Sequence, residues 1–205
     1  GADISVIIGN HDDLEPLAEH YGVDFHVIGD GKGNPDEEDL LELLDEYDTD
    51  LIVLARYMRI LSPNVVFRYE DRIINVHPSL LPSFPGAEAY RQARDEGVRI
   101  ACVTAHYVTT DLDQGPIITQ RAFDVPPGAA VEEIERRGQP LEADALIEAV
   151  RLHLDQAVSV YHGRTELRDD ADPDRYRFGL PASVDGMLPD RPIDGLGEAV
   201  AEPDD

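Results

Sequence analysis

The sequence predicts an α/β fold in which a mostly parallel sheet carries helices on both faces. Two observations predict it. First, four short apolar runs alternate with stretches of helical periodicity, which is the pattern of parallel βαβ units with right-handed crossovers. These runs occupy residues 4–8, 24–28, 51–54 and 73–77. Second, the last run ends in Asn75 and His77, which leave the same face of a strand and lie at the end where such sheets bind ligands.

The first two helices are marked by their end signals. Asp12 is predicted to cap the first helix, with Glu15 completing an Asp-x-x-Glu box and Gly22 ending it. Asn34-Pro35 is expected to open the second helix, because acidic residues fill the turn that follows and leucines then recur at helical spacing. The glycine-rich stretch 29–34 fits neither phosphate-loop spacing, so we interpret it as a turn.

The middle of the chain continues the alternation. Ser62-Pro63 is expected to start a short helix that runs through Arg68, and Gly86 is expected to precede a helix over about 87–96. Two long β-rich runs follow, joined by a polar loop. They cover residues 100–108 and 117–125. Cys102, in the first of these runs, is interpreted as a small buried hydrophobe, and a single cysteine allows no disulfide.

The last third of the chain is predicted to contain a helical region, a hairpin and a tail. Residues 130–154 have a helical pattern that is interrupted at Gly138 and Pro140, which leaves open two helices or one kinked helix. The runs on either side of His162-Gly163 indicate a small hairpin. Residues 169–205 contain five prolines and eleven acidic residues with almost no apolar periodicity, so we expect a disordered or loosely packed acidic tail.

Composition narrows the class of protein. The 205 residues include 43 acidic and 17 basic side chains, and the net charge of −26 disfavours nucleic acid as a partner because the chain repels phosphate. The sequence has no apolar run of about twenty residues and no basic-apolar leader, so we expect a cytoplasmic protein without a membrane partner. The acidic residues are spread along the chain rather than gathered in an interaction tail, which favours a halophilic protein whose charges are screened by salt.

Three polar groups are candidates for chemistry. Asn75 and His77 supply an amide and an imidazole at one strand end, and the loop 109–116 supplies the carboxylate of Asp113, with Asp111 as the rival acid. An amide, an imidazole and a carboxylate together can carry out acyl transfer. The alternative is that these are ordinary loop side chains whose polar atoms are satisfied by the backbone.

Three motifs resemble the formyltetrahydrofolate-dependent formyl-transfer family. They are ARYMRILSP at 55–63, NVHPSLLP at 75–82 and HYVTTDLDQGP at 106–116. The similarity runs from about Ile4 to Leu167, and it implies a Rossmann-like sheet of the formyltransferase type. It also implies a catalytic domain over 1–168 that lacks the first strand and helix of the family. The missing strand would lie between the predicted strands 4–8 and 51–54, which would then not pair with each other.

The resemblance assigns catalysis to Asn75, His77 and Asp113. The Asn75 amide and a protonated His77 would stabilise the oxyanion of a tetrahedral intermediate, and His77 would also protonate the departing nitrogen. Asp113 would hold the charge of His77 and orient the attacking water. His106 is given a structural or supporting role, and Pro85 stands where the family often has a lysine. The residues expected to contact the substrate are Arg59, Ile60, Leu61, Thr110, Asp111, Leu112 and His106.

The family contains hydrolases and transferases, and several stretches look more like its deformylases. These stretches are residues 9–14, 104–107, 136–138 and 150–154. The resemblance therefore implies hydrolysis of 10-formyltetrahydrofolate to formate and tetrahydrofolate, with the formate feeding purine biosynthesis as part of one-carbon metabolism. Formyl transfer to glycinamide ribonucleotide is the alternative, and a folate-binding regulatory module is the alternative that is not an enzyme. The folate is a substrate, no metal or permanent cofactor is expected, and the full protein is expected to be a homo-oligomer.

Overall fold

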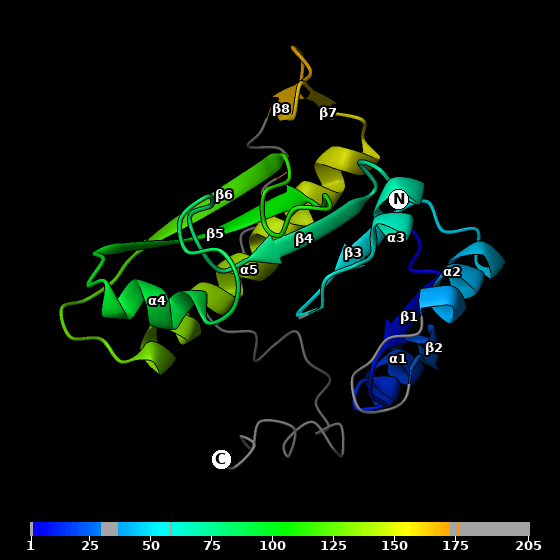
Figure 1. The fold of residues 1–205 in the computed structure, drawn as a ribbon, viewed down its shortest axis with the longest axis horizontal. Helices are drawn as coiled ribbons and strands as arrows, with labels where there is room; N and C mark the ends of the chain where they lie inside the picture. Colours follow the sequence, from blue (N-terminus) through cyan, green and yellow to red (C-terminus); the bar gives the residue numbers. More distant parts are fainter. Residues whose placement is uncertain (1, 30–36, 58, 173–175, 177–205) are drawn as a thin grey trace. The chain divides into compact units, whose positions relative to one another are not determined.

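The computed structural model describes residues 2–29, 37–57, 59–172 and 176 (Figure 1). The described residues as far as Asp50 form one compact unit, and those from Leu51 form a second. No helix in these described ranges is long and apolar enough to cross a membrane.

The first unit is built on two parallel strands. β1 (Val6–Gly9) pairs with β2 (Asp24–Val27), with α1 (Glu15–Tyr21) between them and α2 (Glu37–Glu46) after them. The unit buries a small apolar set: Ala18, Ile28, Leu40 and Leu44.

The ends of α1 test the predicted signals. Gly22 ends α1 in the left-handed conformation, with φ of 67°, as predicted. The prediction that Asp12 caps this helix is wrong, because α1 begins only at Glu15, after a turn in which the Glu15 N–H donates to the Asp12 carbonyl at 2.9 Å. Pro16 favours this later start, since proline is well tolerated in a first helical turn. The predicted Asn34-Pro35 start of α2 and nearly all of the glycine-rich turn lie outside the described residues.

The second unit contains a four-stranded mixed sheet in the order β3-β4-β5-β6. Its strands are β3 (Ile52–Leu54), β4 (Ile73–His77), β5 (Ile100–Tyr107) and β6 (Ile117–Asp124). β3 and β4 are parallel, whereas β5 is antiparallel to both β4 and β6. The connections contain α3 (Pro63–Arg68), with the predicted bounds, and α4 (Ala89–Asp95), which starts about two residues later than predicted. β1 and β3 belong to different sheets, and the missing strand between them stays a prediction.

One long helix covers one face of this sheet. α5 (Val131–Leu154) is continuous through Gly138 and Pro140 and packs against β4, β5 and β6 (Figure 1). Of the two possibilities that the sequence left open, a single helix is therefore the outcome. The apolar core between helix and sheet is formed by Ile74, Val103, Ala105 and Tyr107 from the strands and by Ala145, Ala149 and Leu152 from α5. Cys102 is buried, as predicted.

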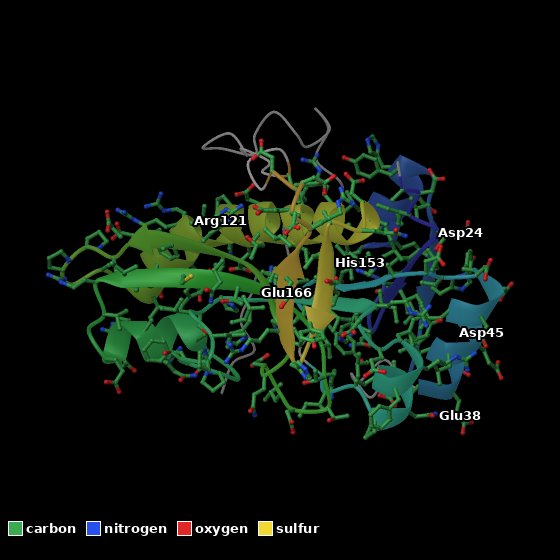
Figure 2. The ribbon with its side chains drawn as sticks, turned by 90° about the horizontal axis from the view of Figure 1, so that it is seen from above. Asp24, Glu38, Asp45, Arg121, His153 and Glu166 are labelled. Carbon is green, nitrogen blue, oxygen red and sulfur yellow. The ribbon has the colours of Figure 1, made fainter. Side chains whose placement is uncertain are left out.

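An ion-pair cluster joins α5 to β6. The Arg121 side chain, labelled in Figure 2, lies 3.0 Å from Asp144 through Nε and also pairs with Glu148, both on α5. Glu148 is buried, and a buried carboxylate is tolerated only with such partners. The cluster therefore helps to hold α5 in register on the sheet.

The predicted hairpin is present as β7 (Val158–Tyr161) and β8 (Arg164–Leu167), which pair antiparallel around His162 and Gly163. The start of the predicted tail differs from the expectation of a disordered or loosely packed segment. Tyr176 is buried and belongs to the core cluster beneath α5, so the chain after 168 contributes to packing at that point. Residues 173–175 and 177–205 lie outside the described residues, and the disorder of the tail stays a prediction.

Candidate active site

The site is built on the face of β4 and β5 that points away from α5. Side chains alternate along a strand, so Asn75 and His77 leave the face opposite to Ile74. The antiparallel register places His106 of β5 opposite Asn75 and Thr104 opposite His77. Asn75 and His77 share one face at the carboxyl end of β4, as their spacing predicted, and the register adds His106 and Thr104 to that face.

Thr104 fixes the loop that follows β4. Its hydroxyl donates to the Ser79 carbonyl at 2.7 Å and accepts from the Leu81 N–H at 3.3 Å and from the Gln120 amide at 2.9 Å. The Thr104 side chain is fully buried, and these three bonds satisfy its hydroxyl. Sequence reasoning gave Thr104 no role, although a hydroxyl within an apolar strand is a signal for such a contact.

Asp113 joins the β5–β6 loop to His77 and to the loop after β4. Its Oδ2 lies 3.5 Å from Nδ1 of His77 and accepts the Gly86 N–H at 2.8 Å, while Oδ1 lies 3.9 Å from Nε2 of His106. Asp113 is 8% exposed and has a left-handed backbone, with φ of 53°, which aspartate tolerates better than most residues. The carboxylate therefore lies between the two imidazoles. This position is the one expected of a residue that balances a positive charge on His77.

His77 faces oxygen acceptors at both ring nitrogens. Nε2 lies 2.9 Å from the Phe84 carbonyl, and Nδ1 faces the Asp113 carboxylate. Both acceptors can receive a hydrogen bond at the same time only when each ring nitrogen carries a proton. This geometry suits a proton donor, and the Phe84 carbonyl is a contact that sequence reasoning missed.

His106 is held in a different state. Its Nδ1 donates to the Tyr107 carbonyl at 2.8 Å, and its Nε2 lies 3.5 Å from the Asn75 amide nitrogen. Burial lowers the pKa of His106 from its ordinary value, and the nearby His77 lowers it further, outweighing the Tyr107 carbonyl and the Asp113 carboxylate, which raise it. The two imidazoles therefore differ in their contacts: His77 faces an oxygen acceptor at each ring nitrogen, whereas His106 faces a backbone carbonyl at Nδ1 and an amide nitrogen at Nε2.

Apart from His106 of β5, the residues predicted to bind the substrate lie in two loops of the same unit. Leu61 is buried, whereas Ile60 is 68% exposed and Leu112 is 49% exposed. Arg59, Thr110 and Asp111 are exposed as well. The structure thus brings Asn75, His77, His106 and Asp113 together and leaves Arg59, Ile60, Thr110, Asp111 and Leu112 on the surface, where their role stays a prediction.

The assembled groups match the needs of acyl chemistry at a formyl-like carbon. An amide N–H and an imidazolium can stabilise a developing oxyanion, the imidazolium can protonate a leaving nitrogen, and the carboxylate can orient water. Within the described parts of the chain, no group of three or more His, Cys, Asp or Glu side chains is arranged to hold a metal ion.

Comparison with known proteins places this geometry in context. Residues 1–150 match the formyl transferase family. The chain is 44% identical over 165 residues to the formyltetrahydrofolate deformylase of Synechocystis sp., and 43% identical over 169 residues to that of Bacillus subtilis. These alignments cover 80% of this chain in each case, but only 58% and 55% of the two relatives.

Solved structures give the same picture. A formyltetrahydrofolate deformylase from Pseudomonas syringae aligns with a TM-score of 0.78 at 35% identity, over 82% of this chain and 57% of that one. A glycinamide ribonucleotide transformylase 1 from Symbiobacterium toebii aligns with a TM-score of 0.75 at 38% identity, over 81% of each chain. The chain thus spans less than two thirds of the deformylases and most of the transformylase.

Proposed function

The chain belongs to the formyl transferase family, and from this premise we propose that it hydrolyses 10-formyltetrahydrofolate to formate and tetrahydrofolate. One observation carries the proposal: His77 lies between the Asp113 carboxylate and the Phe84 carbonyl, two residues along the strand from Asn75. The deformylase names of the relatives at 44% and 43% identity support water as the acceptor of the formyl group.

The reaction follows from these groups. A water oxygen attacks the formyl carbon and gives a proton to Asp113, while the carbonyl oxygen becomes an oxyanion. The Asn75 amide stabilises this oxyanion together with the His77 imidazolium, whose Nε2 N–H exchanges the Phe84 carbonyl for the oxyanion. The C–N bond then breaks, and His77 gives its proton to the departing nitrogen. The proton on Asp113 passes to His77, which restores both groups, and formic acid leaves and ionises to formate. In this proposal the folate itself is held by the two loops, through Arg59, Ile60 and Leu61 and through Thr110, Asp111 and Leu112.

Formyl transfer to glycinamide ribonucleotide is the second candidate, because the chain covers 81% of a transformylase of the same fold. The two functions share the formyl donor and the catalytic groups and differ only in the acceptor.

Formate release from 10-formyltetrahydrofolate by the full-length natural protein, with and without glycinamide ribonucleotide, separates the candidates. We expect formate in both conditions and no formylated ribonucleotide. Formylated ribonucleotide without formate would make the protein a transferase. Folate binding with neither product would make it a binding module.

The cellular setting is part of the proposal. We place the reaction in the cytoplasm, where its formate supports purine biosynthesis, and we expect the full protein to be a homo-oligomer. The 26 excess negative charges support a halophilic protein, because salt screens their mutual repulsion in the folded state. Thermal melts in rising potassium chloride should therefore show a rising midpoint, and a midpoint that is highest at low salt would contradict this part of the proposal.

A further inference from the structure

His106 lies opposite Asn75 of the neighbouring strand. The antiparallel register of β4 and β5 is regular, with His106 paired to Asn75 and Thr104 paired to His77. On the other side of β5, Ala105 pairs with Thr119 but His106 pairs with Ile117, so Ile118 is the extra residue of a bulge in β6. The bulge leaves β5 regular, and His106 therefore shares the face of the sheet that carries Asn75.

The protonation of the His106 ring follows from its contacts. A carbonyl oxygen can only accept, so the 2.8 Å contact with the Tyr107 carbonyl requires the proton on Nδ1. The loop after β5 lies tightly against that carbonyl, because a Cβ on Gly115 would come within 1.8 Å of it. The neutral ring therefore has a lone pair at Nε2, and the Asn75 amide nitrogen is the donor that faces it at 3.5 Å.

We propose that His106 is a positioning residue for the reaction and that it acts through Asn75. Nε2 of the neutral ring accepts one N–H of the Asn75 amide, which settles which end of the amide is nitrogen and leaves the second N–H to meet the oxyanion. This inference rests on the proposed function for its catalytic meaning, while the pairing of His106 with Asn75 stands on the geometry alone. The separation of 3.5 Å is long, as hydrogen bonds in active sites without substrate often are.

Protonation of His106 would reverse this arrangement. A charged ring has an N–H at Nε2, so Asn75 would have to turn its carbonyl oxygen inward and present the wrong end of the amide to the oxyanion. Four influences act on the pKa of His106. Burial and the nearby His77 lower it, while the hydrogen bond to the Tyr107 carbonyl and the Asp113 carboxylate, 3.9 Å away, raise it. Burial is the largest of these effects, so the neutral ring is kept near neutral pH.

A double-mutant cycle in the full-length protein tests the proposal. His106→Leu removes the acceptor, and we expect kcat for formate release to fall on the order of 10²-fold with KM changed less than about twofold, because a misplaced oxyanion donor mainly affects the transition state. His106→Gln is the matched control, since its side-chain oxygen can accept the amide N–H, and it should recover most of the lost kcat. In an Asn75→Ala background, His106→Leu should change kcat by less than about twofold.

Two results would overturn the proposal. Equal losses from His106→Leu with and without the Asn75 side chain would show that His106 does not act through Asn75. A raised KM at unchanged kcat would make His106 a substrate-binding residue.

A measurement without turnover separates this inference from the proposed function. In nitrogen NMR spectra of the wild-type protein we expect the His106 ring to be protonated at Nδ1 alone, and its protonation at Nε2 alone would reject the inference. The Asn75 side-chain N–H signals should shift in His106→Leu and return in His106→Gln, and unchanged signals would also reject it. A wild-type protein that releases no formate would instead reject the proposed function and leave these spectra to decide the pairing.

Discussion

The two faces of β4 and β5 differ in chemistry although they share one backbone. The face beneath α5 carries Ile74, Val103, Ala105 and Tyr107. The opposite face carries Asn75, His77, Thr104 and His106. The first set is held by apolar burial against one long helix. Every hydrogen-bonding partner described above for the second set comes from strand β4 or β5, from β6, or from the two loops that flank the site.

The difference teaches how a small sheet can bury several polar groups. Apolar burial stabilises a fold by ~25 cal/mol per Å², so a fully buried face supplies stability that does not depend on the chemistry of the other face. The polar face needs a partner for every buried group, since an unsatisfied one costs ~1–3 kcal/mol. Changes on the α5 face should therefore alter stability, and changes on the polar face should alter turnover.

The largest effect is expected from Asp113→Asn on the polar face. Asparagine tolerates the left-handed backbone and can still accept the Gly86 N–H, but it has no charge to hold the His77 imidazolium. We expect turnover to fall by ~10²–10⁴-fold, the range typical of acid–base and orienting groups. The affinity for a non-hydrolysable folate analogue and the melting temperature should change little. Nearly normal turnover would show that Asp113 only stabilises its turn. A loss of affinity for the folate analogue as large as the loss of turnover would show that Asp113 binds the substrate.

The next effect is expected on the α5 face. Ile74 is fully buried and adjacent to Asn75 in sequence, but its side chain points to α5. Ile74→Ala should lower the free energy of unfolding by ~2–5 kcal/mol because it leaves a cavity, and Ile74→Val, the graded control, by only ~0.5–1.5 kcal/mol. Denaturant titration measures both values. The comparison of the two faces fails if kcat of the folded Ile74→Val variant drops in parallel with its stability.

Much of the fold could be predicted because its signals are local. Ser62-Pro63 predicted the start of α3, and the two-residue spacing of Asn75 and His77 predicted that they share one face of the strand. The Asp12 cap failed because the Asp-x-x-Glu spacing competed with Pro16, which set the start of α1. The continuity of α5 could not be predicted, because Gly138 and Pro140 both lower helix propensity and the sequence does not show the packing of the helix on the sheet.

The candidate site divides in the same way. Asn75, His77 and Asp113 could be found from side-chain chemistry and from motif resemblance. The Phe84 carbonyl and the Gly86 N–H could not, since backbone groups have no signature in a sequence. The register that places His106 opposite Asn75 is a property of strand pairing, which the sequence of β5 alone does not express.

The Gly138→Ala substitution tests a second packing contact of α5. A Cβ at this position would lie 1.9 Å from the Tyr90 hydroxyl, which donates to the Glu142 carboxylate at 2.5 Å. The substitution gains ~1 kcal/mol in helix propensity, yet we expect a net loss of ~1–3 kcal/mol in the free energy of unfolding, because Tyr90 is displaced and the half-buried Glu142 loses its donor.

A Tyr90→Leu background provides the control for this prediction. With the ring removed, Gly138→Ala should become neutral or stabilising by up to ~1 kcal/mol in denaturant titrations. The same destabilisation in both backgrounds would show that the close approach of Tyr90 is not the reason for glycine at 138.

The smallest effect concerns the histidine on the α5 face, His153, whose Nδ1 lies 2.9 Å from the Tyr107 hydroxyl. Burial raises the pKa of Tyr107 to about 12, so the hydroxyl keeps its proton and donates it to a neutral His153. Burial, and then Arg72, lower the pKa of His153, while Asp71 raises it less. A lowered folded-state pKa means that stability is fully present above the ordinary value of 6.5 and is lost as the pH falls through the folded-state pKa.

We therefore expect the melting temperature of His153→Gln to fall less steeply with decreasing pH than that of the wild type. The difference between the two proteins should be less than about 4 °C, and kcat should be unchanged. A steeper decline, or a loss of turnover, would show that the two faces are coupled through Tyr107.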